Sequence, residues 1–198
     1  MSGEPADERT RAPIMPNTAR PHELALPVAS LAALRRALVD STGDDAAARA
    51  LQLAGVAAGD AFFKLLSPPG PAGDSALPAE WNEGVFWRRF AEMFERRGWG
   101  RIANERVHPG VAALDAFDWV ESDAEMGASR PSCFFTAGLL ANLLGRVVQD
   151  EVAVLEVECR SRGDARCRFL YGSPQNLDAV FGRLRAGAAL EETLAALV

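Results

Sequence analysis

The segment EVECRSRGDARC, residues 156–167, places two of the three cysteines of this chain on either side of a turn signal. A Gly-Asp pair favours a tight turn, and the runs before and after it, VAVLEVEC and ARCRFLYG, have the composition of strands. A hairpin centred on Gly163 places Cys159 directly opposite Cys167. The segment therefore predicts a β-hairpin that holds two thiols side by side.

Three further pairs follow from this register: Val157 with Phe169, Glu158 with Arg168, and Arg160 with Arg166. The first pair is apolar and the second joins opposite charges, but the third brings two arginines together. We expect a cluster of thiolates to supply the negative charge that the two arginines need.

The third cysteine opens a predicted helix. In SRPSC, residues 129–133, Ser132 is the expected N-cap and Cys133 the first helical residue. Free backbone N–H groups and the helix dipole stabilise a thiolate at such a position. Cys133 is therefore expected to join Cys159 and Cys167 as a third sulfur ligand for a metal.

Zinc binds four ligands, and the residues alone leave the fourth one open. Glu156 and Glu158 both flank Cys159, whereas the two histidines of the chain, His22 and His108, lie far from it in sequence. Strict alternation along a strand points Glu156 away from the face of Cys159, so this residue could bind only if the strand bulges.

Two other interpretations of the cysteines compete with a metal. They could be three unconnected buried residues that behave as small hydrophobic side chains. Cys159 and Cys167 could also form a disulfide, although disulfides are rare in the cytoplasm and an odd number of cysteines leaves one without a partner. We favour the metal because it uses all three thiols.

The composition predicts a cytoplasmic globular protein. Of 198 residues, 48% are hydrophobic and 24% are charged, which suits one substantial core. The net charge of -6 argues against a nucleic-acid surface, which needs clustered Lys and Arg. No apolar run approaches the roughly 18 residues of a membrane span. The sequence has no dinucleotide-binding glycine fingerprint, P-loop or nucleophile elbow, so we expect no catalytic activity.

Outward from the hairpin, the chain is expected to form helices around two hairpins. Strands are predicted over 100–108, 111–121, 152–159 and 165–172, and helices over 28–38, 44–66, 81–97, 133 to about 147, 173–184 and 189–197. We expect a flexible leader over 1–27, a loop rich in Pro and Gly over 67–78, and a single domain over 28–198. This order predicts an α+β fold in which an antiparallel sheet of two hairpins is packed against helices.

The predicted helix after Cys133 has a face of small residues. Gly138, Ala141 and Gly145 lie on it, and we expect this face to pack closely on the sheet. Aromatic residues also lie on elements that should surround the sheet, namely Phe86, Phe90, Phe94, Phe117, Trp119 and Phe134. They could line an apolar pocket, although an aromatic stripe at helical spacing more often fills a core.

The cysteine pattern resembles the vinyl-4-reductase domain family. The resemblance covers about 84–171, and its most specific part is Cys133 followed by EVEC, seven residues, and a cysteine that precedes Arg-Phe. The family includes input domains of phenol- and aromatic-responsive bacterial activators, bacteriochlorophyll-synthesis accessory proteins and stand-alone proteins. Its fold, the ligand-binding fold of NO signalling and Golgi transport, is shared with subunits of the TRAPP tethering complex.

The resemblance implies a site and a function. The zinc ligands would be Cys133, Glu156, Cys159 and Cys167, which favours Glu156 over Glu158 and implies a local bulge. Since these four ligands leave zinc no open position, the metal would be structural. An apolar pocket between sheet and helices would accept a small hydrophobic or aromatic molecule.

We therefore expect a zinc-stabilised, non-catalytic sensor or carrier domain that forms a homodimer. The resemblance also leaves two alternatives. One is an accessory or carrier protein in the vinyl reduction of bacteriochlorophyll precursors, as the family name suggests. The other is a dimeric protein-interaction scaffold, whose contact surface would be the amphipathic helices of 28–66.

Overall fold

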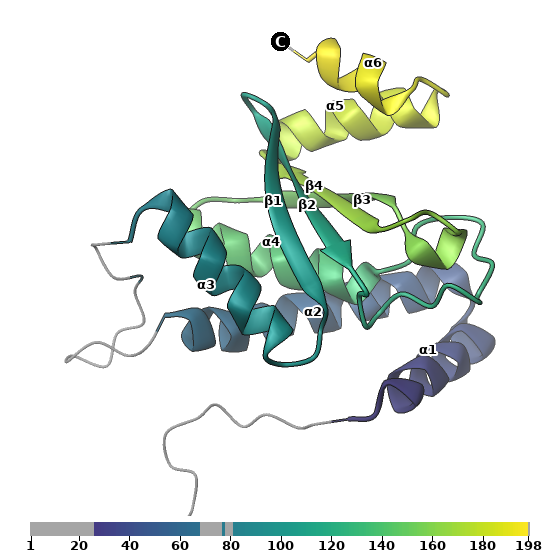
Figure 1. The fold of residues 1–198 in the computed structure, drawn as a ribbon. Coiled ribbons are helices and arrows are strands. Elements are labelled where there is room, and N and C mark those ends of the chain that lie inside the picture. The colour runs from purple at the N-terminus through teal and green to yellow at the C-terminus, as the bar shows by residue number, and fades with distance from the viewer. Residues whose placement is uncertain (1–25, 68–76, 78–80, 198) are drawn as a thin grey trace, which may run out of the picture.

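The structure, a computed structural model, describes residues 26–67, 77 and 81–197. Four strands within these residues form one sheet in the order β1-β2-β4-β3, and all neighbouring strands are antiparallel (Figure 1). The predicted α+β class and the sheet of two hairpins are confirmed. The predicted leader and the loop over 67–78 fall almost entirely outside the described residues.

The strands are β1 (Arg101–His108), β2 (Val111–Phe117), β3 (Ala153–Glu158) and β4 (Cys167–Gly172). The helices are α1 (Val28–Thr42), α2 (Asp44–Leu66), α3 (Glu83–Glu95), α4 (Phe134–Val148), α5 (Pro174–Arg185) and α6 (Leu190–Ala195), with a short 3₁₀ helix η1 (Arg160–Arg162) between β3 and β4. Strand β2 ends earlier than predicted because Asp118 has a left-handed backbone, with φ of 52°. None of the described helices is long and apolar enough to cross a membrane.

The sheet separates two hydrophobic cores (Figure 1). Side chains alternate along β2, so that Leu114 and Ala116 belong to the core formed with α2, α3 and α4, whereas Val111 and Ala113 belong to the core formed with α5 and α6. The first core is the larger one and contains the three cysteines. The candidate site therefore lies on the face of the sheet that α4 covers.

Helices α2 and α4 pack with their backbones in contact. A Cβ atom on Gly55 of α2 would lie 1.9 Å from the carbonyl oxygen of Phe135, and one on Gly138 of α4 would lie 2.1 Å from the carbonyl oxygen of Gln52. The prediction that the small-residue face of α4 packs on the sheet was therefore wrong at Gly138. The larger side chains of α4 fill the space above the sheet, and its glycine lets the second helix approach.

The contact between α2 and α4 leads to a stability prediction. Gly55→Ala should lower the free energy of unfolding by about 2 kcal/mol or more, because the new methyl group meets the backbone of α4. Gly182→Ala in α5 is the matched control, because nothing lies within 4 Å of a Cβ there. This control should raise the free energy of unfolding by about 0.5–1 kcal/mol through helix propensity. Urea unfolding followed by circular dichroism measures both values, and equal effects would contradict the close contact.

Candidate metal centre

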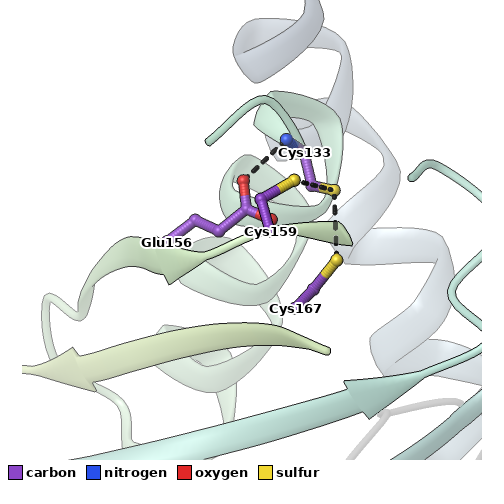
Figure 2. A group of neighbouring side chains, drawn as sticks. All are labelled: Cys133, Glu156, Cys159 and Cys167. Atoms are coloured by element: carbon purple, nitrogen blue, oxygen red, sulfur yellow. Dashed lines mark hydrogen bonds between the residues drawn. The ribbon is translucent and has the colours of Figure 1, made fainter. Parts of the chain in front are cut away.

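Four potential metal ligands meet where the N-terminus of α4 approaches the β3–β4 hairpin (Figure 2). Cys133 is the N-cap of α4, one position before the predicted one, Glu156 lies on β3, Cys159 follows that strand and Cys167 begins β4. Their ligand atoms all lie within 4.8 Å of one another. The three cysteines are fully buried free thiols. The fold thus brings together the four residues that the family resemblance singles out.

A β-bulge in β3 decides which glutamate faces the cysteines. The paired residues are Glu156 with Phe169 and Glu158 with Arg168, so two steps along β3 match one step along β4. The extra residue, Val157, turns Glu156 toward α4 and leaves Glu158 on the opposite face with Arg168. The pairing of Glu158 with Arg168 and the local bulge are confirmed. The predicted pairing of Val157 with Phe169 was wrong, because that register assumed a regular strand.

Local hydrogen bonds hold the turn that carries Cys159. Gly163 has φ of 97°, a left-handed conformation that favours glycine. The carboxylate of Asp164 accepts a hydrogen bond from the backbone N–H of Cys159 at 2.7 Å and forms an ion pair with Arg162. The turn predicted at Gly163 is therefore present, and it fixes the backbone of one candidate ligand.

The two arginines that the sequence placed opposite each other have different surroundings. Arg160 lies in η1, beyond the end of the paired strand. The Nε atom of Arg166 lies 3.2 Å from a carboxylate oxygen of Asp115 and 3.2 Å from one of Glu158. Carboxylates supply the negative charge at Arg166, so the prediction that thiolates do so was wrong.

The carboxyl group of Glu156 has one satisfied and one unsatisfied oxygen. Oε2 accepts a hydrogen bond from the backbone N–H of Cys133 at 2.7 Å, whereas Oε1 is buried with no hydrogen-bond partner among the described residues. A buried carboxylate oxygen without a partner is costly unless a cation satisfies it. This carboxyl group lies within the cluster of sulfurs, so the donor set fits a metal ion.

The thiols are close enough to share hydrogen bonds. The Sγ atom of Cys133 lies 3.8 Å from those of Cys159 and Cys167. Among protein groups alone, hydrogen bonds from Cys133 and Cys167 lower the pKa of Cys159. Burial, followed by the charge of Cys159, raises the pKa of Glu156 to about 9. The protein groups therefore favour one thiolate surrounded by protonated neighbours, and a divalent cation is what would let all four ligands ionise together.

The effect of α4 on Cys133 differs from the expectation. Hydrogen bonds with Cys159 and Cys167, followed by burial and the charges of Glu156 and Glu121, raise the pKa of Cys133 well above its usual value. The helix N-terminus does not offset these effects, because carboxylates already accept its N–H groups. Glu156 takes the N–H of Cys133, and Glu121 takes those of Phe135 and Thr136.

Glu121 is a structural residue of the site that sequence reasoning missed. It is buried, and it also accepts a hydrogen bond from the hydroxyl group of Thr136 at 2.5 Å, while Trp119 donates its indole N–H to the same hydroxyl at 2.8 Å. Glu121 follows β2 and precedes the helix it caps by more than a turn of chain, so no local capping motif reveals it. An acidic residue among apolar neighbours was the one available signal.

The six aromatic residues predicted to line a pocket lie in two kinds of place. Phe86, Phe90, Phe94 and Trp119 are buried in the core between α3, α4 and the sheet. They belong to a continuous network of ring contacts that also contains Phe62, Trp87, Trp99, Phe135 and Tyr171, which the sequence did not single out.

Phe117 and Phe134 lie outside this network. Each is half-buried and lies beneath the guanidinium group of an arginine, Arg101 over Phe117 and Arg130 over Phe134. The fold therefore brings four of the six predicted residues together in one cluster and leaves two at its surface.

Residues 115–172 match the family model of the vinyl-4-reductase domain. The predicted family resemblance is confirmed. The match begins in β2 and ends with β4, so it contains α4 and all four candidate ligands. No curated protein shows a significant sequence match to this chain.

Solved structures show the same fold. The phenol-responsive sensory domain of the transcription activator PoxR, determined with phenol, is 18% identical, with a TM-score of 0.63 over 84% of each chain. Trafficking protein particle complex subunit 3 from Naegleria fowleri, covalently bound to palmitic acid, is 12% identical, with a TM-score of 0.50 over 73% of this chain and 91% of that one. A vinyl-4-reductase family protein from Methanocaldococcus jannaschii is 18% identical, with a TM-score of 0.48 over 75% of this chain and 82% of that one.

The bulge predicts which glutamate matters for metal binding. Glu156→Gln should weaken zinc binding at least about tenfold, because it removes the charged oxygen beside the sulfurs. Glu158→Gln, two residues away on the other face, should leave the affinity unchanged. Competition with a chromophoric chelator measures both constants. The reverse order of effects would show that the bulge does not select the ligand.

Zinc affinity should rise with pH between about 6 and 9, because metal ligands must lose their protons. The pKa of Cys133 is raised and that of Glu156 is raised to about 9, so both groups hold protons at neutral pH that a metal must displace. Calorimetric titration at about pH 7.5, in two buffers with different ionisation enthalpies, should show at least about two protons released per zinc. Release of none would mean that zinc binds elsewhere.

Proposed function

We propose that this chain is a zinc-stabilised, non-catalytic domain that binds a small apolar or aromatic molecule. The observation that carries the proposal is the buried group of three thiols and one carboxyl, whose ligand atoms lie within 4.8 Å of one another. The likeness in fold to a phenol-responsive sensory domain supports the ligand class. The metal and the ligand are separate parts of the proposal, and each can be tested alone.

The metal would act as a structural crosslink. Its ligands come from the start of α4 and from both arms of the β3–β4 hairpin, so one ion would join a helix to two strands. Four protein ligands would complete the coordination of zinc and leave no position for a substrate or a water molecule. This is the arrangement of a structural site, which is why we propose binding and not catalysis.

The ligand would be recognised mainly by aromatic side chains. The ring network extends from Trp87 and Tyr171 at one end to Phe135 at the other, and it lies on the same face of the sheet as the cysteines. Such surfaces bind apolar molecules with little need for charge. The hydroxyl of Thr136, already bonded to Trp119 and Glu121, is the polar group at the edge of this network.

We also propose that the domain forms a homodimer through α1 and α2. Leu34 of α1 and Leu53 of α2 are 61% and 69% exposed, and a second copy of the chain would cover them. The three cysteines are fully buried, so association through this face would not need them.

Native mass spectrometry and thermal melting test the proposed function. Protein purified without added metal or chelator should carry one zinc per chain and appear as a dimer. Cys159→Ser should lose the zinc and melt roughly 10 °C lower or more, because several kcal/mol of folding free energy are lost with the ion. The parent treated with a strong chelator should melt like the variant.

A panel of uncharged aromatic compounds then tests ligand binding. At least one compound should raise the melting midpoint of the zinc-loaded parent, because binding only the native state stabilises it. Less than a tenth of an equivalent of zinc would end the metal proposal, and a panel without effect would end the ligand proposal. Pigment that elutes with the protein would favour the alternative of a tetrapyrrole carrier.

A further inference from the structure

We infer that the hollow beneath α1 is a binding site for an uncharged molecule with an apolar body and one hydrogen-bond-accepting oxygen, which rests on the proposal that this chain binds small molecules. We call this space the α1 hollow. It has a volume of about 400 Å³ and lies between α1, α2, the first turn of α4 and the segment that follows β2. That volume falls in the range of small-molecule sites.

The walls of the α1 hollow are mostly apolar. Leu31 of α1, Leu51 of α2, Phe135 of α4 and Val120 face it from four different segments. Side chains from four segments surround the space more fully than a groove between two helices would. The interior aromatic network has no comparable space at its centre, because Phe90, Phe94 and Trp119 are at most 1% exposed and their rings are 5.1–5.4 Å apart.

Arg35 gives the α1 hollow its polar anchor. It is the buried residue of α1, and its side chain lines the hollow. Its one hydrogen bond within the described part of the chain runs from Nη1 to the backbone oxygen of Glu121 at 3.2 Å. A guanidinium group has five N–H donors, so four remain for another acceptor. A buried arginine with unused donors is costly, and an oxygen of a bound molecule would reduce that cost.

The charges around Arg35 favour an uncharged ligand. Glu121 lies beside it and uses its carboxylate to cap α4, and Asp123 and Glu125 line the same hollow. An adjoining hollow of about 570 Å³ shares Arg35 and adds both acids and bases, namely Arg36, Asp40, Asp44 and Arg130. A carboxylate ligand would gain from Arg35 but would be repelled by three nearby acids. A ketone, phenol or alcohol oxygen accepts the same hydrogen bond without that repulsion.

The α1 hollow also touches the residues that support the metal centre. Phe135 stacks on Trp99 with ring centroids 5.8 Å apart, so one wall of the hollow is the end of the aromatic network. Phe135 also donates its backbone N–H to Glu121 and lies two residues after Cys133. A molecule in the hollow would therefore contact the same helix end that carries a candidate metal ligand.

Fluorescence of prodan, an uncharged naphthalene with one ketone, tests this site on the full-length zinc-loaded chain. Its emission should shift to shorter wavelength on binding to the parent. Leu31→Trp should fill the hollow and abolish the shift, and Arg35→Met should weaken binding about tenfold or more through loss of the charged donor. Leu34→Trp is the matched control, since Leu34 is on the same helix but exposed, and it should bind prodan as the parent does.

Competition between two nearly isosteric compounds tests the charge. 2-Acetylnaphthalene should displace prodan at concentrations at least tenfold lower than 2-naphthoate does, and equal or better displacement by the anion would overturn the assignment of an uncharged ligand. Far-UV circular dichroism checks that each variant is folded, and Ala32→Leu is a smaller filling change if Leu31→Trp is not.

The results separate this inference from the proposed function. Unchanged prodan binding by folded Leu31→Trp or Ala32→Leu, or no binding by the parent, would overturn the site. Aromatic compounds that still raise the melting midpoint of the folded filled variant would then place the ligand elsewhere and leave the proposed function intact. Loss of both the prodan signal and the midpoint shift in the filled variant, with both retained in Leu34→Trp, would support the site.

Discussion

The N-terminus of α4 is the point at which the parts of this fold are joined. Two buried carboxyl groups accept the N–H groups of its first turn, Glu156 from β3 and Glu121 from the segment after β2. Each comes from a different hairpin, so the helix end ties both hairpins of the sheet together. The positive end of the helix dipole compensates part of the cost of burying these carboxyls. The sulfur cluster, the aromatic network and the α1 hollow are all arranged around this helix end.

The bulge at Val157 shows how one extra residue determines the chemistry of a site. In a regular strand, side chains three positions apart point to opposite faces, which would separate Glu156 from Cys159. The bulge restores them to one face, while Glu158 joins the ion pairs of Arg166 and Arg168 on the other. The two glutamates, nearly adjacent in sequence, therefore have unrelated roles.

Local sequence signals were enough to predict the elements and the fold class, because hairpin turns and amphipathic periods are local. The same signals brought Cys159 and Cys167 together and placed Cys133 at a helix start. They could not locate the bulge, since residues on both sides of Val157 suit either register, and the family resemblance supplied it. Nor could they find Glu121, whose partners are set by tertiary contacts, or the packing of Gly138 on α2, which depends on where a distant helix lies.

The complete burial of the three sulfurs has a kinetic consequence. A metal among them would have no route to solvent through the native structure, so its rate of exchange would depend on how often η1 and the end of β3 open away from α4. Such local opening is a property of the hairpin and its turn, including Gly163 and the hydrogen bond from Cys159 to Asp164. Two variants with equal affinity for the ion could then differ widely in how long they retain it.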